Sequence, residues 1–369
     1  MSELIIFVLM LGINDPFHIK CDLEFEADGI IALDFDDDQC CDLLRIRDNH
    51  YYLTDQKLIS RFQLNPRGPR SYLACTDIDG IAGKEMLFAA FESGILFLEV
   101  FSSGKEFSRH ELLHDLPEAW DGMLSACKAS DLNDDGNQDL ICLVGSNFSL
   151  QPRGILVYDH ARNRELWHFW MGVSPRDLHL LDIDRDGKEE IIISTTAVAN
   201  GSSVNGFDDR NSYVICFDTR GAVKWSRIIG NTFTDAVTWV GDIDDDGNIE
   251  IVVVEAEGRA DRVEPNRICI LNAADGSVKR YIVSGGKHMD LVVCDLDRND
   301  TREIIVGNID GFVRVYDFDL YCMNERLFDG RIDIKSAVDI DGDGYLELLV
   351  TINNNRLLVL NERLETVGE

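Results

Sequence analysis

The sequence has few basic residues for its length. Lys and Arg total 35 against 67 Asp and Glu among 369 residues, which gives a formal net charge of -32. Contact with a phosphate backbone needs clustered basic side chains, so a nucleic-acid partner is not expected. Much of the acid lies in one repeated phrase, described below, which accounts for the charge without a basic partner.

Long apolar runs and a recognisable leader are also missing. The most apolar stretch near the start, residues 4–11 (LIIFVLML), is too short to span a bilayer and has no basic region before it. We expect a strand there. A remnant of a longer parent chain and a degenerate signal peptide are the alternatives. No membrane span is expected in this chain.

The ten cysteines form no C-x-x-C pair, so they indicate neither a zinc site nor a thioredoxin-like motif. Most stand singly in apolar runs, as small buried residues do in a reducing compartment. This pattern favours a cytoplasmic location, and an extracytoplasmic one is the alternative. The sequence also lacks a nucleophile elbow and a phosphate-binding glycine loop. It therefore gives no catalytic residues, and a non-enzyme is favoured.

The chain does contain one acidic phrase seven times, of the form D-x-[D/N]-x-[D/N]-G-x-x-[D/E]. The clearest copies start at Asp131 (DLNDDGNQD), Asp182 (DIDRDGKEE), Asp242 (DIDDDGNIE) and Asp339 (DIDGDGYLE), and looser copies start at Asp34, Asp77 and Asp295. Successive starts lie 43 to 60 residues apart. A period in this range is typical of repeat architectures.

The spacing within the phrase is that of a divalent-cation loop. Alternate residues turn oxygen atoms inward, the glycine permits a sharp bend, and the ninth residue closes the shell. Hard oxygen donors suit calcium, and we expect five to seven structural ions. The candidate ligands, at positions one, three, five, seven and nine, are Asp34, Asp36, Asp38, Asp42, Asp77, Asp79, Glu85, Asp131, Asn133, Asp135, Asn137, Asp139, Asp182, Asp184, Asp186, Lys188, Glu190, Asp242, Asp244, Asp246, Asn248, Glu250, Asp295, Asp297, Asn299, Thr301, Glu303, Asp339, Asp341, Asp343, Tyr345 and Glu347.

Two copies depart from the phrase. The Asp77 copy has Ile81 and Ala82 where a ligand and the glycine are expected, and the Asp295 copy has Asp300 in place of the glycine. We therefore expect the Asp77 copy to bind metal least well. We interpret the ions as structural, each joining the first strand of a repeat to the next strand. A calcium sensor needs an element that switches between two conformations, and a closed repeat fold offers none.

A short run rich in Ile and Val follows each phrase, such as residues 190–194 (EIIIS) and 249–254 (IEIVVV), and three further strand-like runs complete each repeat. Four strands in each of seven repeats predict one all-β domain over residues 1–369, a seven-bladed β-propeller. Residues 17–25 are expected to supply the outer strand of the last blade. An EF-hand is excluded, because it needs a helix on each side of its loop.

These loops and strands resemble the FG-GAP or VCBS repeats of integrin α-subunit propellers over about residues 26–361. The resemblance implies that each calcium loop joins the first and second strands of its blade, on one face of the disc. It also implies that ligands meet the opposite face.

Three consecutive links between second and third strands are long, at residues 146–153, 196–211 and 256–266. They belong to the face opposite the loops, and long links on a rigid scaffold often bind ligands. Tolerated decoration is the alternative, and trimming residues 197–210 is expected to leave the fold intact. The candidate ligand-face residues, including charges that could ring a central channel, are Asn200, Asn205, Asp208, Asp209, Arg210, Arg259, Arg262, Arg176, Lys287, His288 and Arg331.

These features favour a non-catalytic module that binds a protein partner, alone or as one domain of a larger protein. A glycan-binding or lyase-like propeller is the alternative. For that function only Lys287, His288 and Arg331 could abstract a proton. Four tryptophans could form a sugar platform, but at strand spacing we expect them to pack between blades.

Overall fold

The computed structural model describes residues 29–33, 42–47, 50–54, 60–64, 70–79, 84–102, 107–257, 266–284, 288–339, 344–353 and 356–367. These residues form strands, bridges and turns. No helix occurs among them, and hence none that is long and apolar enough to cross a membrane. The prediction of an all-β chain is confirmed.

The strands pair in antiparallel groups that follow the repeats of the sequence. The first three groups are β1 (Gly29–Leu33), β2 (Asp42–Arg47), β3 (His50–Thr54) and β4 (Ser60–Leu64); β5 (Arg70–Thr76), β6 (Glu85–Glu92), β7 (Ile95–Phe101) and β8 (Phe107–Leu113); and β9 (Gly122–Ser130), β10 (Asp139–Ser146), β11 (Gly154–Asp159) and β12 (Arg164–Trp170). Within each of these groups, a strand pairs only with the strands next to it in chain order, as in a β-meander.

Three further groups are joined edge to edge by single bridging pairs, Thr196 with Asp235 and Ala256 with His288. They are β13 (Ser174–Leu181), β14 (Glu190–Thr196), β17 (Ser212–Phe217) and β18 (Val223–Gly230); β19 (Thr234–Gly241), β20 (Glu250–Glu257), β21 (Arg267–Asn272) and β22 (Val278–Val283); and β23 (His288–Cys294), β24 (Glu303–Asn308), β25 (Phe312–Tyr316) and β26 (Cys322–Leu327). A small hairpin, β15 (Ser203–Val204) and β16 (Phe207–Asp208), lies in the link between β14 and β17.

The last group has three described strands, β27 (Ile332–Val338), β28 (Glu347–Ile352) and β29 (Arg356–Leu360). Beyond β29 the chain turns back, so that Thr366 bridges Leu360 and the N–H of Val367 donates to the carbonyl of Val359 at 2.9 Å. Residues 17–25, predicted as an outer strand for this group, lie outside the described residues.

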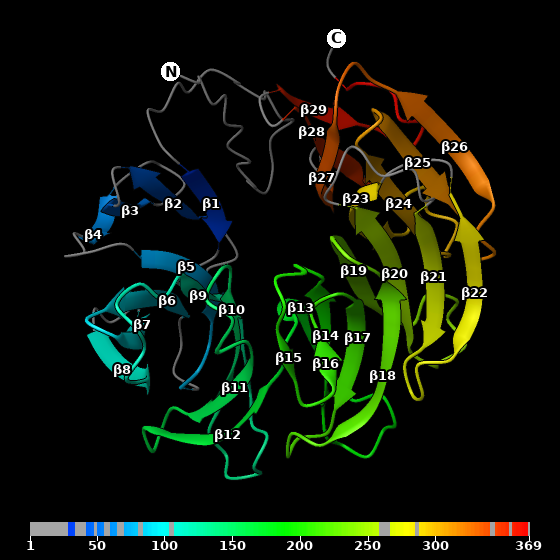
Figure 1. Ribbon diagram of the computed structural model, residues 1–369. Helices are drawn as coiled ribbons and strands as arrows, with labels where there is room; N and C mark the ends of the chain where they lie inside the picture. Colours follow the sequence, from blue (N-terminus) through cyan, green and yellow to red (C-terminus); the bar gives the residue numbers. More distant parts are fainter. Residues whose placement is uncertain are drawn as a thin grey trace.

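Figure 1 shows the groups following one another in chain order around a ring, with β12, β18, β22 and β26 on its outside. Second and third strands are mainly apolar, and β10, β11 and β17 are buried at every position. Such strands suit sheets that are covered on both faces. Outer strands β22 and β26 instead alternate between exposed and half-buried residues.

The core lies between adjacent groups rather than inside any one of them. Ile191 and Ile193 pack against the group before theirs, and Ile192 packs against the group after it. This division follows from the two-residue period of a strand. Five such clusters connect the groups from β5 to β29, in the manner of stacked sheets.

Tryptophans of the outer strands also pack between groups, as predicted. The indole N–H of Trp167 donates to the carbonyl of Thr219 in the next group at 3.1 Å, and Trp225 does the same to Ala273 at 2.9 Å. Gly221 lies under the Trp167 ring with φ of 81°, where a Cβ atom would be 2.7 Å from the ring.

Candidate metal centres and the long-loop face

Every acidic phrase lies between the first and second strands of its group. In the Asp182 loop, the N–H groups of Asp186 and Gly187 donate to the two carboxylate oxygens of Asp182, at 3.1 and 2.9 Å. Gly187 has φ of 88°, and the fourth residue, Arg185, is also left-handed with φ of 61°. The first aspartate therefore stabilises the bend of the loop through these backbone hydrogen bonds alone.

The closing acid at position nine is held in the same way in five loops. In the Asp182 loop the N–H of Ile183 donates to Oε2 of Glu190 at 3.0 Å, and Oε1 accepts from the ammonium of Lys224 at 2.7 Å. Equivalent bonds reach Glu85, Asp139, Glu250 and Glu303. All of these closing acids are buried.

Four loops bring three carboxylates together, each offering an oxygen within 4.8 Å of the others. The groups are Asp77, Asp79 and Glu85; Asp182, Asp184 and Glu190; Asp242, Asp244 and Asp246; and Asp295, Asp297 and Glu303. In the third group, Oδ1 of Asp242 and Oδ1 of Asp244 are buried without a hydrogen-bond partner. Buried anionic oxygens of this kind need a cation, and hard oxygen donors fit Ca²⁺.

The Asp131 loop is arranged differently, although its sequence is one of the clearest copies. The amide of Asn133 donates to both oxygens of Asp139, at 3.1 and 3.0 Å, and Asp135 pairs with Arg162. The hydrogen bond from Arg162 lowers the pKa of Asp135 to about 2. Within the described residues this loop therefore does not gather three free carboxylates.

Burial raises the pKa of two closing acids, and neighbouring acids add to the effect. Burial raises the pKa of Glu303 to about 6, and repulsion from Asp297 and Asp295 adds to the effect. Burial likewise raises the pKa of Asp139 to about 6, with help from Asp159. Both shifts follow first from burial of the carboxyl group and then from the neighbouring acids.

The two departures from the phrase keep the loop geometry where it is described. Asp300 takes the left-handed conformation of the missing glycine, with φ of 64°, and its N–H still donates to Asp295 at 3.1 Å. The Asp77 loop still gathers Asp77, Asp79 and Glu85. The predicted ranking of these loops as weak binders stays a prediction.

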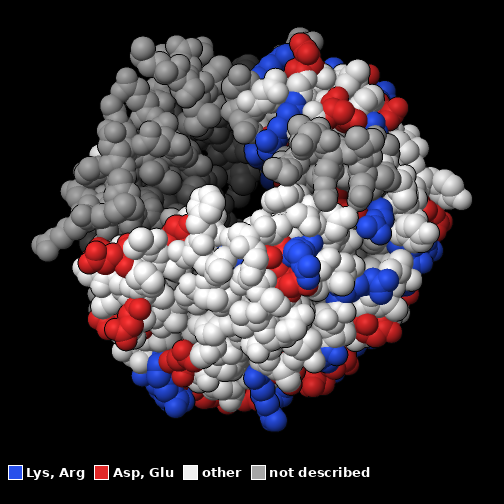
Figure 2. Space-filling model, in the orientation of Figure 1, with Lys and Arg blue, Asp and Glu red and all other residues white. Residues whose placement is uncertain are grey.

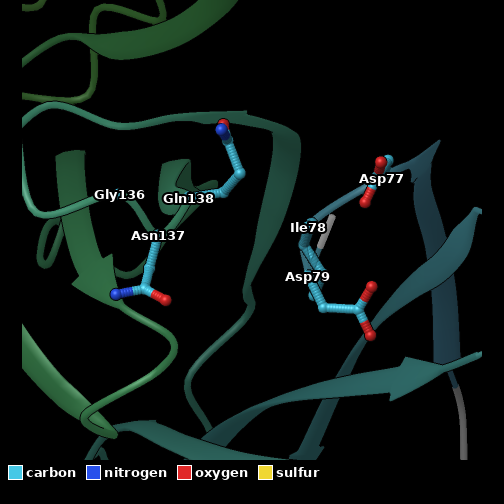
Figure 3. A pocket seen from close by; sticks show the side chains of 6 residues that line it. All are labelled: Asp77, Ile78, Asp79, Gly136, Asn137 and Gln138. Atoms are coloured by element: carbon cyan, nitrogen blue, oxygen red, sulfur yellow. The ribbon is translucent and has the colours of Figure 1, made fainter. Parts of the chain in front are cut away.

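The Asp77 and Asp131 loops face each other across a pocket of about 120 Å³. Its lining residues are Asp77, Ile78, Asp79, Gly136, Asn137 and Gln138. Figure 3 shows Asp77 and Asp79 pointing to the same side of their segment, with Asn137 and Gln138 on the neighbouring loop. Consecutive loops are thus close enough to influence one another.

Basic residues connect consecutive loops. Lys188, predicted as a ligand position, pairs through its ammonium with Asp134 of the previous loop at 2.8 Å. Arg302 donates to the carbonyl of Asp242 at 2.7 Å and to Asp245 at 3.0 Å. At position seven, the N–H groups of Asn137, Asn248 and Thr301 donate to the fifth residue of their own loop.

Some predicted residues lie outside the described part of the chain. They are Asp34, Asp36, Asp38, Asp341, Asp343, Arg259, Arg262 and Lys287, and the side chain of Asp42. Of the last loop, Asp339 accepts from the N–H of Gly344 at 2.9 Å, Glu347 is buried, and Tyr345 lies under Arg298.

On the opposite face, one buried arginine ties the first two long links together. Arg153 is fully buried, and its guanidinium donates to the carbonyl groups of Asn147 at 2.6 Å and Gly172 at 2.9 Å. It also reaches Asn200 Oδ1 at 3.2 Å and lies 3.7 Å from the buried carboxylate of Asp209. Asp209 in turn accepts from the N–H groups of Asn200 and Ser202.

Phe148 projects from this tied region with 90% of its surface exposed. Its position is fixed because Asp121 accepts from the N–H groups of Phe148 and Ser149, at 2.6 and 2.9 Å. Met123 and Leu150 are also exposed, and they lie close in sequence to Asp121 and Phe148 respectively. The result is an apolar projection on a backbone held by hydrogen bonds, and the charged and polar residues of these links gave no sign of it in the sequence.

The predicted channel charges pair with one another. Arg176 lies 3.1 Å from Asp235 of the next group, and Arg331 lies 2.8 Å from Asp333. His288 is completely buried, so as it stands it is not available to a ligand on the surface. In the middle link, Asp208 pairs with Arg210, and Asn205 donates to the carbonyl of Trp170 at 3.0 Å.

Figure 2 shows one face of the molecule, on which charged side chains lie mainly toward the rim. Residues other than Lys, Arg, Asp and Glu cover a broad area inward of them. A surface of this kind can meet a partner without burying many charges.

The sequence matches no family model and no curated protein. Solved structures do resemble the fold. The Dos1 propeller has a TM-score of 0.54 at 13% identity, over 85% of this chain and 73% of that one. BBS1N, solved in complex with ARL6DN, has 0.53 at 11% identity, over 90% and 91%. Hydrazine synthase of Kuenenia stuttgartiensis has 0.51 at 14% identity, over 88% and 93%. At these identities the likeness establishes a propeller-like fold alone.

Proposed function

We propose that this chain is a calcium-stabilised, seven-bladed β-propeller that binds a protein partner through its long-loop face. The long-loop face is defined by the links at residues 147–153 and 197–211 and the turns beside them, and residues 258–265 of the third predicted link lie outside the described residues. The observation that carries the proposal is the exposed Phe148, held by Asp121 and by the links around Arg153. A largely exposed aromatic side chain on a backbone held by hydrogen bonds is typical of an interface anchor.

The blade count is supported by the strand pairing. Six described groups have four strands and the last has three, with seven loops in matching positions. A fourth strand from residues 17–25 would complete the last blade and remove a free sheet edge. Thr366 and Val367 occupy part of the outer edge of β29.

Calcium is supported by the carboxylate clusters and by the unpaired oxygens of Asp242 and Asp244. These residues would hold the ion, and the ion would neutralise the repulsion between them. Each site stabilises the fold by about 2.7 kcal/mol when calcium is at a hundredfold excess over its dissociation constant. Unfolding entropy of about 2.1 cal/mol/K per residue over 369 residues converts this to roughly 3 °C per site.

Calorimetry in calcium and in EDTA tests the metal part. Several occupied loops should raise Tm by roughly 10 °C, and elemental analysis of the desalted protein should find several calcium ions per chain. Coincident melting curves together with metal-free protein would rule out structural calcium.

A partner is supported by one structural neighbour, because BBS1N was solved in complex with ARL6DN. No observation on this chain favours a glycan over a protein. The test is quantitative capture of cellular proteins on the immobilised chain, compared among wild type, Phe148→Asp and Tyr281→Asp. Tyr281 is a matched control, since it is 64% exposed on outer strand β22.

We expect Phe148→Asp to lose specific proteins that both other forms retain, and purified candidates to bind with at least tenfold weaker affinity. Proteins lost equally from both variants, or from neither, would show that the long-loop face is not the interface. Binding to a glycan array that survives Phe148→Asp would instead support the glycan alternative.

A further inference from the structure

A β-bulge recurs at the same place in the outer strands of five groups. In β18, Cys216 pairs with Trp225 and Phe217 pairs with Val223, so Lys224 is the extra residue. The corresponding extra residues are Lys279 in β22, Met323 in β26, Leu166 in β12 and Arg61 in β4. A bulge redirects the side chain of the extra residue. In these outer strands the bulge lies at the end of the strand nearest the acidic loop of its group.

Where the bulge residue is lysine, its ammonium reaches the acidic loop of its own group. Lys224 Nζ lies 2.7 Å from Oε1 of Glu190 and 3.0 Å from Oδ2 of Asp184. These are the ninth and third positions of the loop, and they point into the carboxylate cluster. The contact is well formed, because Glu190 is 6% exposed and Oε2 is already fixed by the N–H of Ile183.

Lys279 makes the same approach in the next group. Its Nζ lies 2.6 Å from Oε1 of Glu250 and 4.0 Å from carboxylate oxygens of Asp244 and Asp246. The Asp242 loop nevertheless keeps two buried carboxylate oxygens without partners. Here the ammonium compensates only part of the charge.

The sixth group has no such cation. Its bulge residue is Met323, half exposed, while the Asp295 loop gathers Asp295, Asp297 and Glu303 as tightly as the Asp182 loop does. The chain therefore contains an acidic loop with a lysine ammonium beside it and an equivalent loop without one. The two bulge residues, Lys224 and Met323, occupy equivalent backbone positions.

We propose that the bulge lysines Lys224 and Lys279 are built-in cations that partly replace calcium in their loops, so that the Asp295 loop depends more on the free ion than the Asp182 and Asp242 loops do. This inference rests on the calcium sites of the proposed function. An ammonium 2.7 Å from a ligand oxygen repels a divalent ion bound to that oxygen, and a like charge at such range disfavours binding strongly.

The test exchanges the two bulge residues. Lys224→Met should lower Tm in EDTA, because Glu190 and Asp184 lose their cation, and should enlarge the rise in Tm that calcium produces. Met323→Lys should raise Tm in EDTA, shrink the calcium-induced rise, and weaken the calcium affinity of one site roughly tenfold in isothermal titration. Arg210→Met is the control, because Arg210 forms an exposed pair with Asp208, away from every acidic loop.

The results separate this inference from the metal proposal. If calcium shifts Tm equally in wild type, Lys224→Met and Met323→Lys, the built-in cation is refuted while calcium binding stands. If no form responds to calcium, the metal proposal fails. In that case the bulge lysine could still compensate charge in its loop. A Tm loss in EDTA several times larger for Lys224→Met than for Arg210→Met would show this role, and equal losses would overturn it too.

Discussion

Replacing Arg153 with methionine removes a buried cation while keeping most of the side-chain volume. The guanidinium donates to carbonyl groups of Ser146, Asn147 and Gly172, and it is the cation that lies beside the buried Asp209 carboxylate. Methionine can make none of these hydrogen bonds. The substitution therefore strips the partner from a carboxylate that is 1% exposed.

Breaking a buried charge pair by removing one partner costs about 3–5 kcal/mol, because the remaining charge stays desolvated. The lost hydrogen bonds to carbonyl groups act in the same direction. With an unfolding entropy of about 2.1 cal/mol/K per residue over 369 residues, this corresponds to a fall in Tm of roughly 4–6 °C.

Differential scanning calorimetry measures the shift, and hydrogen exchange of residues 147–153 and 197–211 shows whether the loss is local. Arg210→Met is the control: its pair with Asp208 is exposed, so Tm should fall by less than about 1 °C. Arg153→Met with Asp209→Asn should recover part of the loss, since the unpaired charge is then gone. A Tm within 1 °C of wild type for Arg153→Met alone would refute the reasoning.

Two other perturbations follow from buried groups. Burial, with the charge of Arg314 adding to it, lowers the pKa of His288 to about 4. The unfolded chain therefore binds a proton at this histidine more readily than the folded protein does. The free energy of unfolding falls as the pH is lowered from 6.5 toward 4, by about 3 kcal/mol in all. His288→Gln should remove that part of the slope in urea titrations, and an unchanged slope would contradict the assignment. Gly221→Ala should cost about 1–3 kcal/mol, because its Cβ would meet the Trp167 ring at 2.7 Å. Gly206→Ala, at a similar φ of 85° but in open space, should cost less, and equal Tm losses would show that the ring contact is unimportant.

The sequence by itself determined the repeat, the strands and the place of each loop. Residues 190–194 were expected as a strand and lie within β14, Glu190–Thr196. These features are local: alternation of apolar residues sets the strand, and aspartate and glycine set the bend. The two-sided burial of the second strands could also be predicted from continuous apolar runs such as residues 190–194.

The tertiary structure decided which polar side chains work together. The middle link was expected to be removable, but it supplies Asp209 to the buried Arg153, so trimming residues 197–210 would leave that charge without its partner. The Asp131 phrase reads as a complete shell, yet Arg162 engages its fifth residue. Whether Lys224 faces a loop or solvent depends on one extra residue in β18. Such contacts join residues brought together by strand pairing and by the packing of neighbouring groups, and the local period of a sequence does not record those distances.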